Sequence, residues 1–157
     1  MTVKDTRALR DAFGRFATGV TVLTTRDSDG TPRGFTANSF SSVSLEPPLV
    51  LVCIGNNALS GPAFRAAPHF AINVLSAAQE ETAMLFASRR EDKFEQTEWH
   101  PGLHEVPLLS GALAKIVCAQ HKLVEAGDHV ILIGEVLETA ISDGPALGYH
   151  RGGFISI

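Results

Sequence analysis

Small polar side chains are concentrated in the segment 35–48, which reads Phe-Thr-Ala-Asn-Ser-Phe-Ser-Ser-Val-Ser-Leu-Glu-Pro-Pro. Side chains of this kind let a backbone approach a flat ligand closely, and they supply hydrogen-bond donors and acceptors without bulk. The residues able to do so are Thr36, Asn38, Ser39, Ser42 and Ser44. The segment therefore predicts a ligand-binding surface. The alternative is a polar edge strand followed by a turn, where Ser and Asn are also common.

A cluster of positive charge at Arg89, Arg90 and Lys93 follows the helix predicted for residues 80–87. Guanidinium and ammonium groups bind phosphate through charge-assisted hydrogen bonds. The alternative is a solvated basic helix end, which the helix dipole favours and which Glu91 and Asp92 balance. These residues alone leave both interpretations open.

Two further groups of candidate residues lie towards the C-terminal end. His129 follows Gly127-Asp128 at a predicted hairpin turn, where it is also an ordinary first residue of a strand. The segment 148–154 combines Tyr149 and Arg151 with flexible glycines. An aromatic ring and a guanidinium together suit stacking on a nucleotide and pairing with its charge.

Several other chemistries are disfavoured by the motifs that the sequence lacks. There is no GxSxG motif for a nucleophilic serine, and no GxGxxG motif follows a strand as in a Rossmann site. His100 and His104 have the spacing of zinc ligands on a helix, but Pro101 and Gly102 between them oppose a helix. We therefore expect loop histidines and no metal site.

Composition predicts one domain, residues 1–157, with enough apolar material (45%) for a core. A formal charge of 13 − 17 = −4 argues against a nucleic-acid surface or an anionic membrane as partner. No apolar run reaches the roughly 18 residues that span a bilayer, and the N-terminus lacks a signal peptide's apolar core, so a cytoplasmic protein is expected. Cys53 and Cys118 lie in apolar runs and are expected to be buried, without a disulfide.

The hydrophobic pattern predicts mostly strands joined by turns. A helix is expected over 5–18, with Asp5 or Thr6 as N-cap, and further helices over 60–67, capped by Ser60, and over 80–87. Residues 88–110 are expected to be a polar loop. The predicted strands are 20–25, 33–44, 49–54, 69–75, 112–125, 129–141 and 154–157. This arrangement favours a mainly β antiparallel barrel with a few short flanking helices over a parallel α/β sheet.

Seven ordered motifs carry a resemblance to one family. They are residues 13–20, 34–40, 42–44 with Pro47-Pro48, 70–75, 92–94, 127–129 and 149–153. Together they resemble the short-chain flavin reductases, which are the reductase components of two-component flavin-dependent monooxygenases. The resemblance extends over nearly the whole chain, and it favours the ligand-binding interpretation of each candidate group above.

The resemblance implies an FMN-binding split β-barrel of Greek-key type that forms a homodimer. It implies an NAD(P)H:flavin oxidoreductase that transfers hydride from nicotinamide C4 to flavin N5. Reduced FMN or FAD would then diffuse to a partner monooxygenase, with NADH preferred and NADPH as the alternative reductant. Two other functions stay open: a flavin carrier or sensor without turnover, and a reductase with tightly bound FMN acting on another acceptor such as ferric complexes.

The resemblance also implies site residues. The flavin ring would lie against Thr36, Ala37, Asn38 and Ser39 and against Ser42, Val43 and Ser44, with Cys53 and Ile54 near the ribityl chain. The phosphate would be bound by Ser60, Arg89 and Lys93, with Ser88 and Phe94 also contacting the cofactor. Asn57 would replace a donor that is missing because position 58 is Ala. On the nicotinamide side the resemblance implies His129, as the catalytic residue, with Tyr149 and Arg151.

Overall fold

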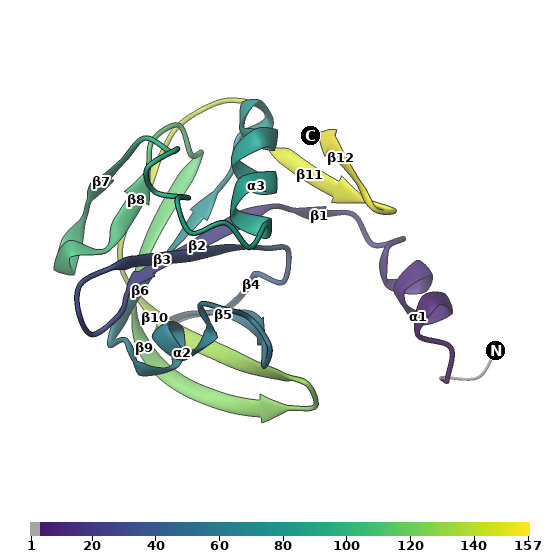
Figure 1. Cartoon of the computed structure of the whole chain (residues 1–157), viewed down its shortest axis with the longest axis horizontal. Helices are drawn as coiled ribbons and strands as arrows, with labels where there is room; N and C mark the ends of the chain where they lie inside the picture. The colour runs from purple at the N-terminus through teal and green to yellow at the C-terminus, as the bar shows by residue number, and fades with distance from the viewer. Residues whose placement is uncertain (1–3) are drawn as a thin grey trace.

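A seven-stranded antiparallel sheet forms the body of the protein in the computed structural model, which describes residues 4–157 (Figure 1). The strand order is β3-β2-β6-β9-β10-β5-β4. These strands are β2 (Thr21–Arg26), β3 (Pro32–Ala37), β4 (Ser41–Leu45), β5 (Pro48–Gly55), β6 (His69–Val74), β9 (Ala114–Ala126) and β10 (His129–Ile141). The predicted long hairpin is confirmed as β9–β10, and it lies near the centre of the sheet.

The sheet curls into a barrel because its two edge strands are consecutive in the chain. Residues 38–40 join β3 to β4, and at about 3.6 Å per residue this link spans no more than about 15 Å. In a flat sheet, six spacings of about 4.8 Å would hold the edges about 29 Å apart. The prediction of one strand over 33–44 is therefore wrong. The chain leaves one edge of the sheet at Ala37 and joins the other edge at Ser41.

The barrel interior is apolar, and its core includes the buried side chains Leu23, Val52, Ile54, Phe64, Phe70 and Leu132. Phe64 comes from helix α2 (Gly61–Ala66), and its ring meets that of Phe35 edge-on at 5.2 Å. Strand β5 alternates between buried and half-exposed residues, as expected for a strand with one face in the core.

Helix α3 (Glu80–Ala87) follows the short turn η1 (Ala77–Gln79) and packs directly on β3. The Thr36 hydroxyl donates a hydrogen bond of 2.6 Å to the Ala83 carbonyl oxygen. Gly34 is buried beneath the helix, where an added Cβ would lie 2.8 Å from the Leu23 carbonyl oxygen and 3.0 Å from the Phe86 ring. Only glycine allows this close approach, so Gly34 determines how deeply α3 sits.

The segment 88–110 contains a small hairpin that the sequence did not predict. Strands β7 (Trp99–Pro101) and β8 (Pro107–Leu109) flank the turn η2 (Leu103–Glu105). Long-range bonds hold the hairpin: the Thr24 hydroxyl donates to the Pro107 carbonyl oxygen at 2.5 Å, and the Leu109 N–H donates to Asn73 Oδ1 at 2.9 Å. Neither partner is a sequence neighbour, which is why a local pattern did not show the hairpin.

The N-terminal helix projects from the barrel as an arm (Figure 1). Helix α1 (Thr6–Phe13) is capped by Asp5, which accepts hydrogen bonds from the N–H groups of Arg7 and Ala8, so the predicted helix and cap are confirmed. The helix is shorter than predicted, because the chain turns at Gly14 into β1 (Thr18–Gly19). Its expected apolar face is uncovered, with Phe13 68% and Phe16 77% exposed.

The C-terminal end is a hairpin and not the single strand that was predicted. Strands β11 (Leu147–His150) and β12 (Gly153–Ser156) pair with each other, and β11 also pairs with β1. The turn between them uses left-handed backbone at Arg151 (φ 53°) and Gly152 (φ 80°), as in the tightest hairpin turns. Arg151 also donates its N–H to the Gly14 carbonyl oxygen, which ties the hairpin to the arm.

Helix α2 and the two cysteines follow the sequence predictions only in part. Helix α2 is present, but Ser60 makes no side-chain capping bond. Both cysteines are free thiols; Cys118 is buried as predicted, which raises its pKa to about 12, whereas Cys53 is only half-buried on β5. Within residues 4–157, no helix combines the length and apolar character needed to cross a membrane.

We expect Gly34→Ala to lower the free energy of unfolding by about 1–3 kcal/mol, because its methyl group overpacks the contact between α3 and β3. Urea denaturation measures the change. Gly19→Ala is the matched control: no atom lies within 4 Å of its added Cβ, and its effect should stay below about 0.5 kcal/mol. Equal losses in the two variants would contradict the role assigned to Gly34.

Candidate functional site

Three adjoining cavities form one groove between the barrel, α3 and the arm. The inner cavity, about 240 Å³, lies between α3, β3 and the turn after β5. The middle cavity, about 530 Å³, adjoins it at Thr36, Ala87 and Ser88. The arm cavity, about 750 Å³, adjoins the middle one at Asn38 and Tyr149. We call this continuous depression the groove.

The groove brings together many residues that the sequence nominated from distant segments. Thr36, Ala37, Asn38, Ser88 and Tyr149 line its middle cavity. The inner cavity contains Asn57, Ser60, Arg89 and Lys93, and Arg151 lines the arm cavity.

Lys93 is a half-buried cation in the lining of the inner cavity. Its ammonium is half-buried and donates to the Phe86 carbonyl oxygen at 3.1 Å, which occupies one of its three N–H groups. Burial lowers the pKa of Lys93, because the loss of hydration disfavours the charged ammonium relative to the neutral amine. The exposed Arg89 guanidinium adds a second cation. A phosphate here would offset the desolvation of Lys93, so the donor set fits a phosphorylated ligand.

Thr18 supplies an unsatisfied polar atom at the other end of the groove. Its hydroxyl oxygen is buried yet has no hydrogen-bond partner among residues 4–157, and Thr18 lines the arm cavity beside Asn38 and Tyr149. A buried hydroxyl without a partner costs free energy, so native sites usually supply one. A ligand with a polar edge in the groove would satisfy it.

Some predicted residues lie outside the groove or have their functional groups engaged. The Ile54 side chain is 1% exposed in the barrel core, so only the backbone of this residue is left to contact a ligand, and its role stays a prediction. The Ser39 hydroxyl donates to the Cys53 carbonyl oxygen and accepts from the Cys53 N–H, which fastens the 38–40 link to β5. The Ser88 hydroxyl donates to the Leu85 carbonyl oxygen and so caps α3.

The segment 42–44 lies on edge strand β4, with a bulge between Ser42 and Ser44, and none of its residues lines the groove. Cys53 likewise lies outside the groove lining, and Phe94 packs edge-on against Phe86 and Trp99. In the single chain, these predicted contacts are therefore not assembled with the rest of the site.

His129 stands at the tip of the β9–β10 hairpin, opposite Gly55 of β5, and is not among the residues that line the groove. Its ring nitrogen Nδ1 lies 2.7 Å from Asp128 Oδ1, and this bond lowers the pKa of the Asp128 carboxyl. The other ring nitrogen, Nε2, is left available to a ligand.

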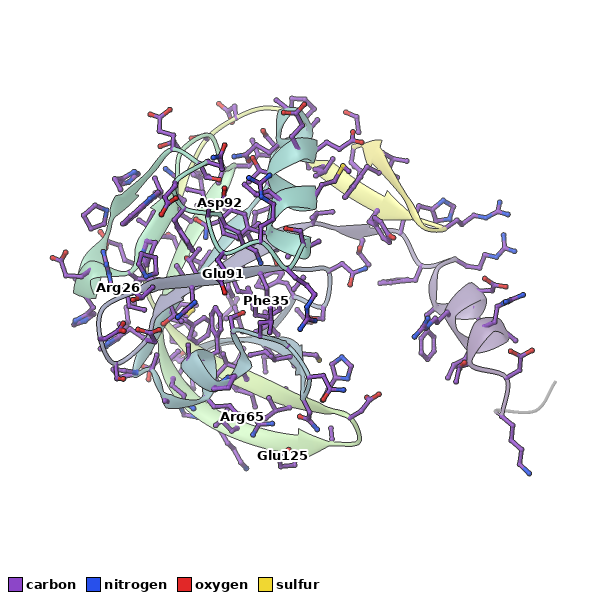
Figure 2. All side chains as sticks on the ribbon, viewed as in Figure 1. Arg26, Phe35, Arg65, Glu91, Asp92 and Glu125 are labelled. Atoms are coloured by element: carbon purple, nitrogen blue, oxygen red, sulfur yellow. The ribbon has the colours of Figure 1, made fainter. Side chains whose placement is uncertain are left out.

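A clamp centred on Arg65 holds the hairpin tip. Arg65 donates to Glu125 Oε1 at 2.7 Å and to Asn56 Oδ1 at 2.8 Å, and Figure 2 shows Arg65 of α2 and Glu125 of β9 close together in the lower part of the view. The Asn56 N–H in turn donates to the Asp128 carbonyl oxygen at 2.9 Å. The clamp therefore joins α2, the turn after β5 and the segment that carries His129.

Sequence reasoning missed several groove residues. Met84 and Ala87 present the exposed face of α3 to the middle cavity, opposite the buried Ala83 and Phe86. Met84 is an apolar residue on the face of the predicted helix opposite to its buried residues, and this position could have indicated a contact with a ligand. The arm residues Arg10, Phe13, Arg15 and Phe16 also line the groove, which local patterns could not indicate.

Metal ligands are not clustered in the described part of the chain: residues 4–157 contain no group of three His, Cys, Asp or Glu side chains suited to an ion. His104 instead stacks on His69 with ring centroids 3.8 Å apart. Burial and the neighbouring His104 lower the pKa of His69.

Comparison with known proteins identifies relatives along almost the whole chain. The profile of the flavin reductase like domain matches residues 13–157. A probable flavin reductase of Rhizobium meliloti is 49% identical, and the reductase component of a flavin-dependent trigonelline monooxygenase of Acinetobacter baylyi is 46% identical. Each alignment covers 98% of this chain but 50% of the relative, so the chain spans about half the length of these two proteins.

A solved structure also matches closely. The Streptomyces globisporus NADH:FAD oxidoreductase SgcE6, in complex with NAD and FAD fragments, superposes with a TM-score of 0.94 at 44% identity. The match covers 99% of this chain and 94% of that one. The predicted barrel class is thereby confirmed.

We expect Thr18→Val to leave the free energy of unfolding nearly unchanged, because it removes a hydroxyl that has no partner. Thr24→Val is the matched comparison, since the Thr24 hydroxyl bonds the Pro107 carbonyl oxygen and accepts from Asn73; its loss should cost about 1–3 kcal/mol. Thermal or urea unfolding of both variants measures this difference. A large loss in Thr18→Val would show that its hydroxyl is satisfied within the protein.

Proposed function

Because the chain belongs to the flavin reductase like domain family, we propose that it is an NADH-dependent flavin reductase that supplies reduced flavin to a monooxygenase. The observation that carries this proposal is the groove. It joins a half-buried phosphate-binding cation, Lys93, to a cavity with the peptide backbone of 36–38 on one side and α3 on the other.

The residue types in the groove, and their sequence along it, suit the successive parts of a flavin nucleotide. Lys93, Arg89 and Ser60 would hold the phosphate, and Asn57 lies beside them in place of the donor missing at Ala58. The segment 36–38 would offer the ring edge its backbone groups and the Asn38 amide. The flavin, once bound, supplies the redox chemistry by accepting a hydride from NADH.

The chain's contribution to the reaction is positioning. Tyr149 and Arg151 flank the middle and arm cavities, where an aromatic face and a guanidinium suit the nicotinamide nucleotide. Holding two rings face to face converts a bimolecular encounter into a unimolecular step and excludes water from between them. No side chain need act as acid or base. His129 lies outside the groove of its own chain, so its proposed contact with the carboxamide of NADH would require a second copy of the chain.

A homodimer is part of this proposal. The arm, edge strand β4 and the end of β10 expose large apolar side chains: Phe13, Phe16, Leu45 at 95% and Ile141 at 84%. Val43 is also exposed on β4. Burial of this apolar surface against a second copy would stabilise the assembly. It would also bring a second chain close to the predicted residues of β4 and β5 that lie outside the groove.

NADH and NADPH oxidation in air, without flavin and with added FMN or FAD, tests the proposed function. We expect turnover that depends on added flavin and saturates with it, because a flavin that must leave cannot bind much more tightly than about 1 μM. Flavin binding without oxidation of either nucleotide would contradict the reductase and identify a carrier or sensor. Retention of tightly bound FMN through purification would indicate another electron acceptor.

His129→Ala should lower kcat/KM for NADH by about tenfold or more, equivalent to about 1.4 kcal/mol, while the Kd for flavin stays unchanged. Steady-state kinetics and a flavin titration measure the two effects separately. His100→Ala is the control, because His100 is an exposed residue of the β7–β8 hairpin. Unchanged NADH turnover in His129→Ala would remove His129 from the mechanism.

A further inference from the structure

The groove continues beyond its phosphate-binding end into a fourth cavity. This distal cavity has a volume of about 340 Å³ and shares Leu59, Ser60, Arg89 and Lys93 with the inner cavity. Three of the shared residues, Ser60, Arg89 and Lys93, are those proposed to bind the flavin phosphate. Any ligand that extends past this phosphate would therefore enter the distal cavity directly.

The distal cavity is positively charged. Four cationic side chains line it, Arg33, Arg89, Arg90 and Lys93, against two carboxylates, Asp27 and Glu91, which leaves a formal charge of 4 − 2 = +2. An excess of positive charge beside the proposed first phosphate site favours a ligand with a second phosphate.

Arg33 is the cation best placed to respond to such a ligand. It belongs only to the distal cavity, and its Nε donates to Asp27 Oδ2 at 2.9 Å. Its two terminal nitrogens have no hydrogen-bond partner among residues 4–157. Arg90, in contrast, already makes two bonds to the Asp92 carboxylate, at 2.9 and 2.6 Å.

The rest of the distal cavity offers flat apolar surface. Pro32, Pro62 and Phe94 contribute to its walls, and Leu59 at its junction with the inner cavity is 62% exposed. Rings and aliphatic groups of this kind pack well against a planar heterocycle. A ligand with a second phosphate next to Arg33 and a heterocycle on this apolar surface would be a nucleotide.

We propose that the distal cavity binds the adenosine monophosphate half of FAD, and that Arg33 selects FAD over FMN by pairing with its second phosphate. The inference rests on the proposed function, because it assumes that a flavin phosphate occupies the inner cavity. FMN ends at that phosphate and leaves the distal cavity empty. FAD continues from it through a second phosphate to adenosine, and Asp27, which holds Arg33, opposes the added negative charge.

Calorimetric titration of the purified protein with FMN and with FAD tests the assignment. Two substitutions are expected to change FAD affinity in opposite directions. Arg33→Gln should weaken FAD binding about fivefold, the size of a well-formed exposed ion pair, with FMN binding unchanged. Asp27→Asn should strengthen FAD binding about twofold, because it removes a repelling charge while its side-chain oxygen can still accept the turn N–H groups of Asp29 and Thr31. Arg7→Gln, on the distant arm, is the control for loss of one positive charge.

Competition by free AMP gives an independent measurement. AMP in the distal cavity should displace FAD and leave the Kd for FMN unchanged. Equal affinities of the wild-type protein for FMN and FAD, equal effects of Arg33→Gln on both flavins, or competition of AMP with both would each overturn the assignment. Binding of neither flavin would instead overturn the proposed function, so the two failures are distinguishable.

Discussion

The close contact between helix α3 and strand β3 is the constraint on which the site depends. With glycine at position 34, the helix lies directly on the strand, and the Thr36 hydroxyl fixes its height by bonding the Ala83 carbonyl oxygen. The end of α3 then places Ser88, Arg89 and Lys93 beside the turn after β5. A larger residue at position 34 would lift the helix and separate the two walls of the inner cavity.

The molecule combines a barrel with a buried apolar core and an open groove at the barrel's rim. The barrel core is apolar, and buried Asn73 uses its amide to join β2, β6 and the β7–β8 hairpin. The groove, by contrast, contains hydrogen-bonding groups that lack a full set of partners, such as the Lys93 ammonium and the Thr18 hydroxyl. Among residues 4–157, the other buried side-chain polar atoms have hydrogen-bond partners. Unsatisfied polar groups at the edge of such a scaffold are expected for a binding site, because the ligand completes the hydrogen bonding.

Local sequence signals located most regular elements, since each depends on neighbouring residues. The Asp5 cap, the alternation along β5 and the β9–β10 hairpin are of this kind. The elements that were predicted wrongly depend on contacts between residues far apart in the sequence. The β7–β8 hairpin depends on Thr24 and Asn73, and the break at 38–40 follows from closure of the barrel.

The sequence by itself determined the barrel class, the family resemblance and most of the candidate phosphate-binding residues, because residue types and short motifs carry that information. Only the tertiary structure decided which of these residues meet. It joined Lys93 to Ser60 and Tyr149 to Asn38, and it placed Ile54 in the core and His129 outside the groove. The physical reason is that strand pairing and helix packing set distances between segments far apart in the chain, and no local pattern encodes those distances.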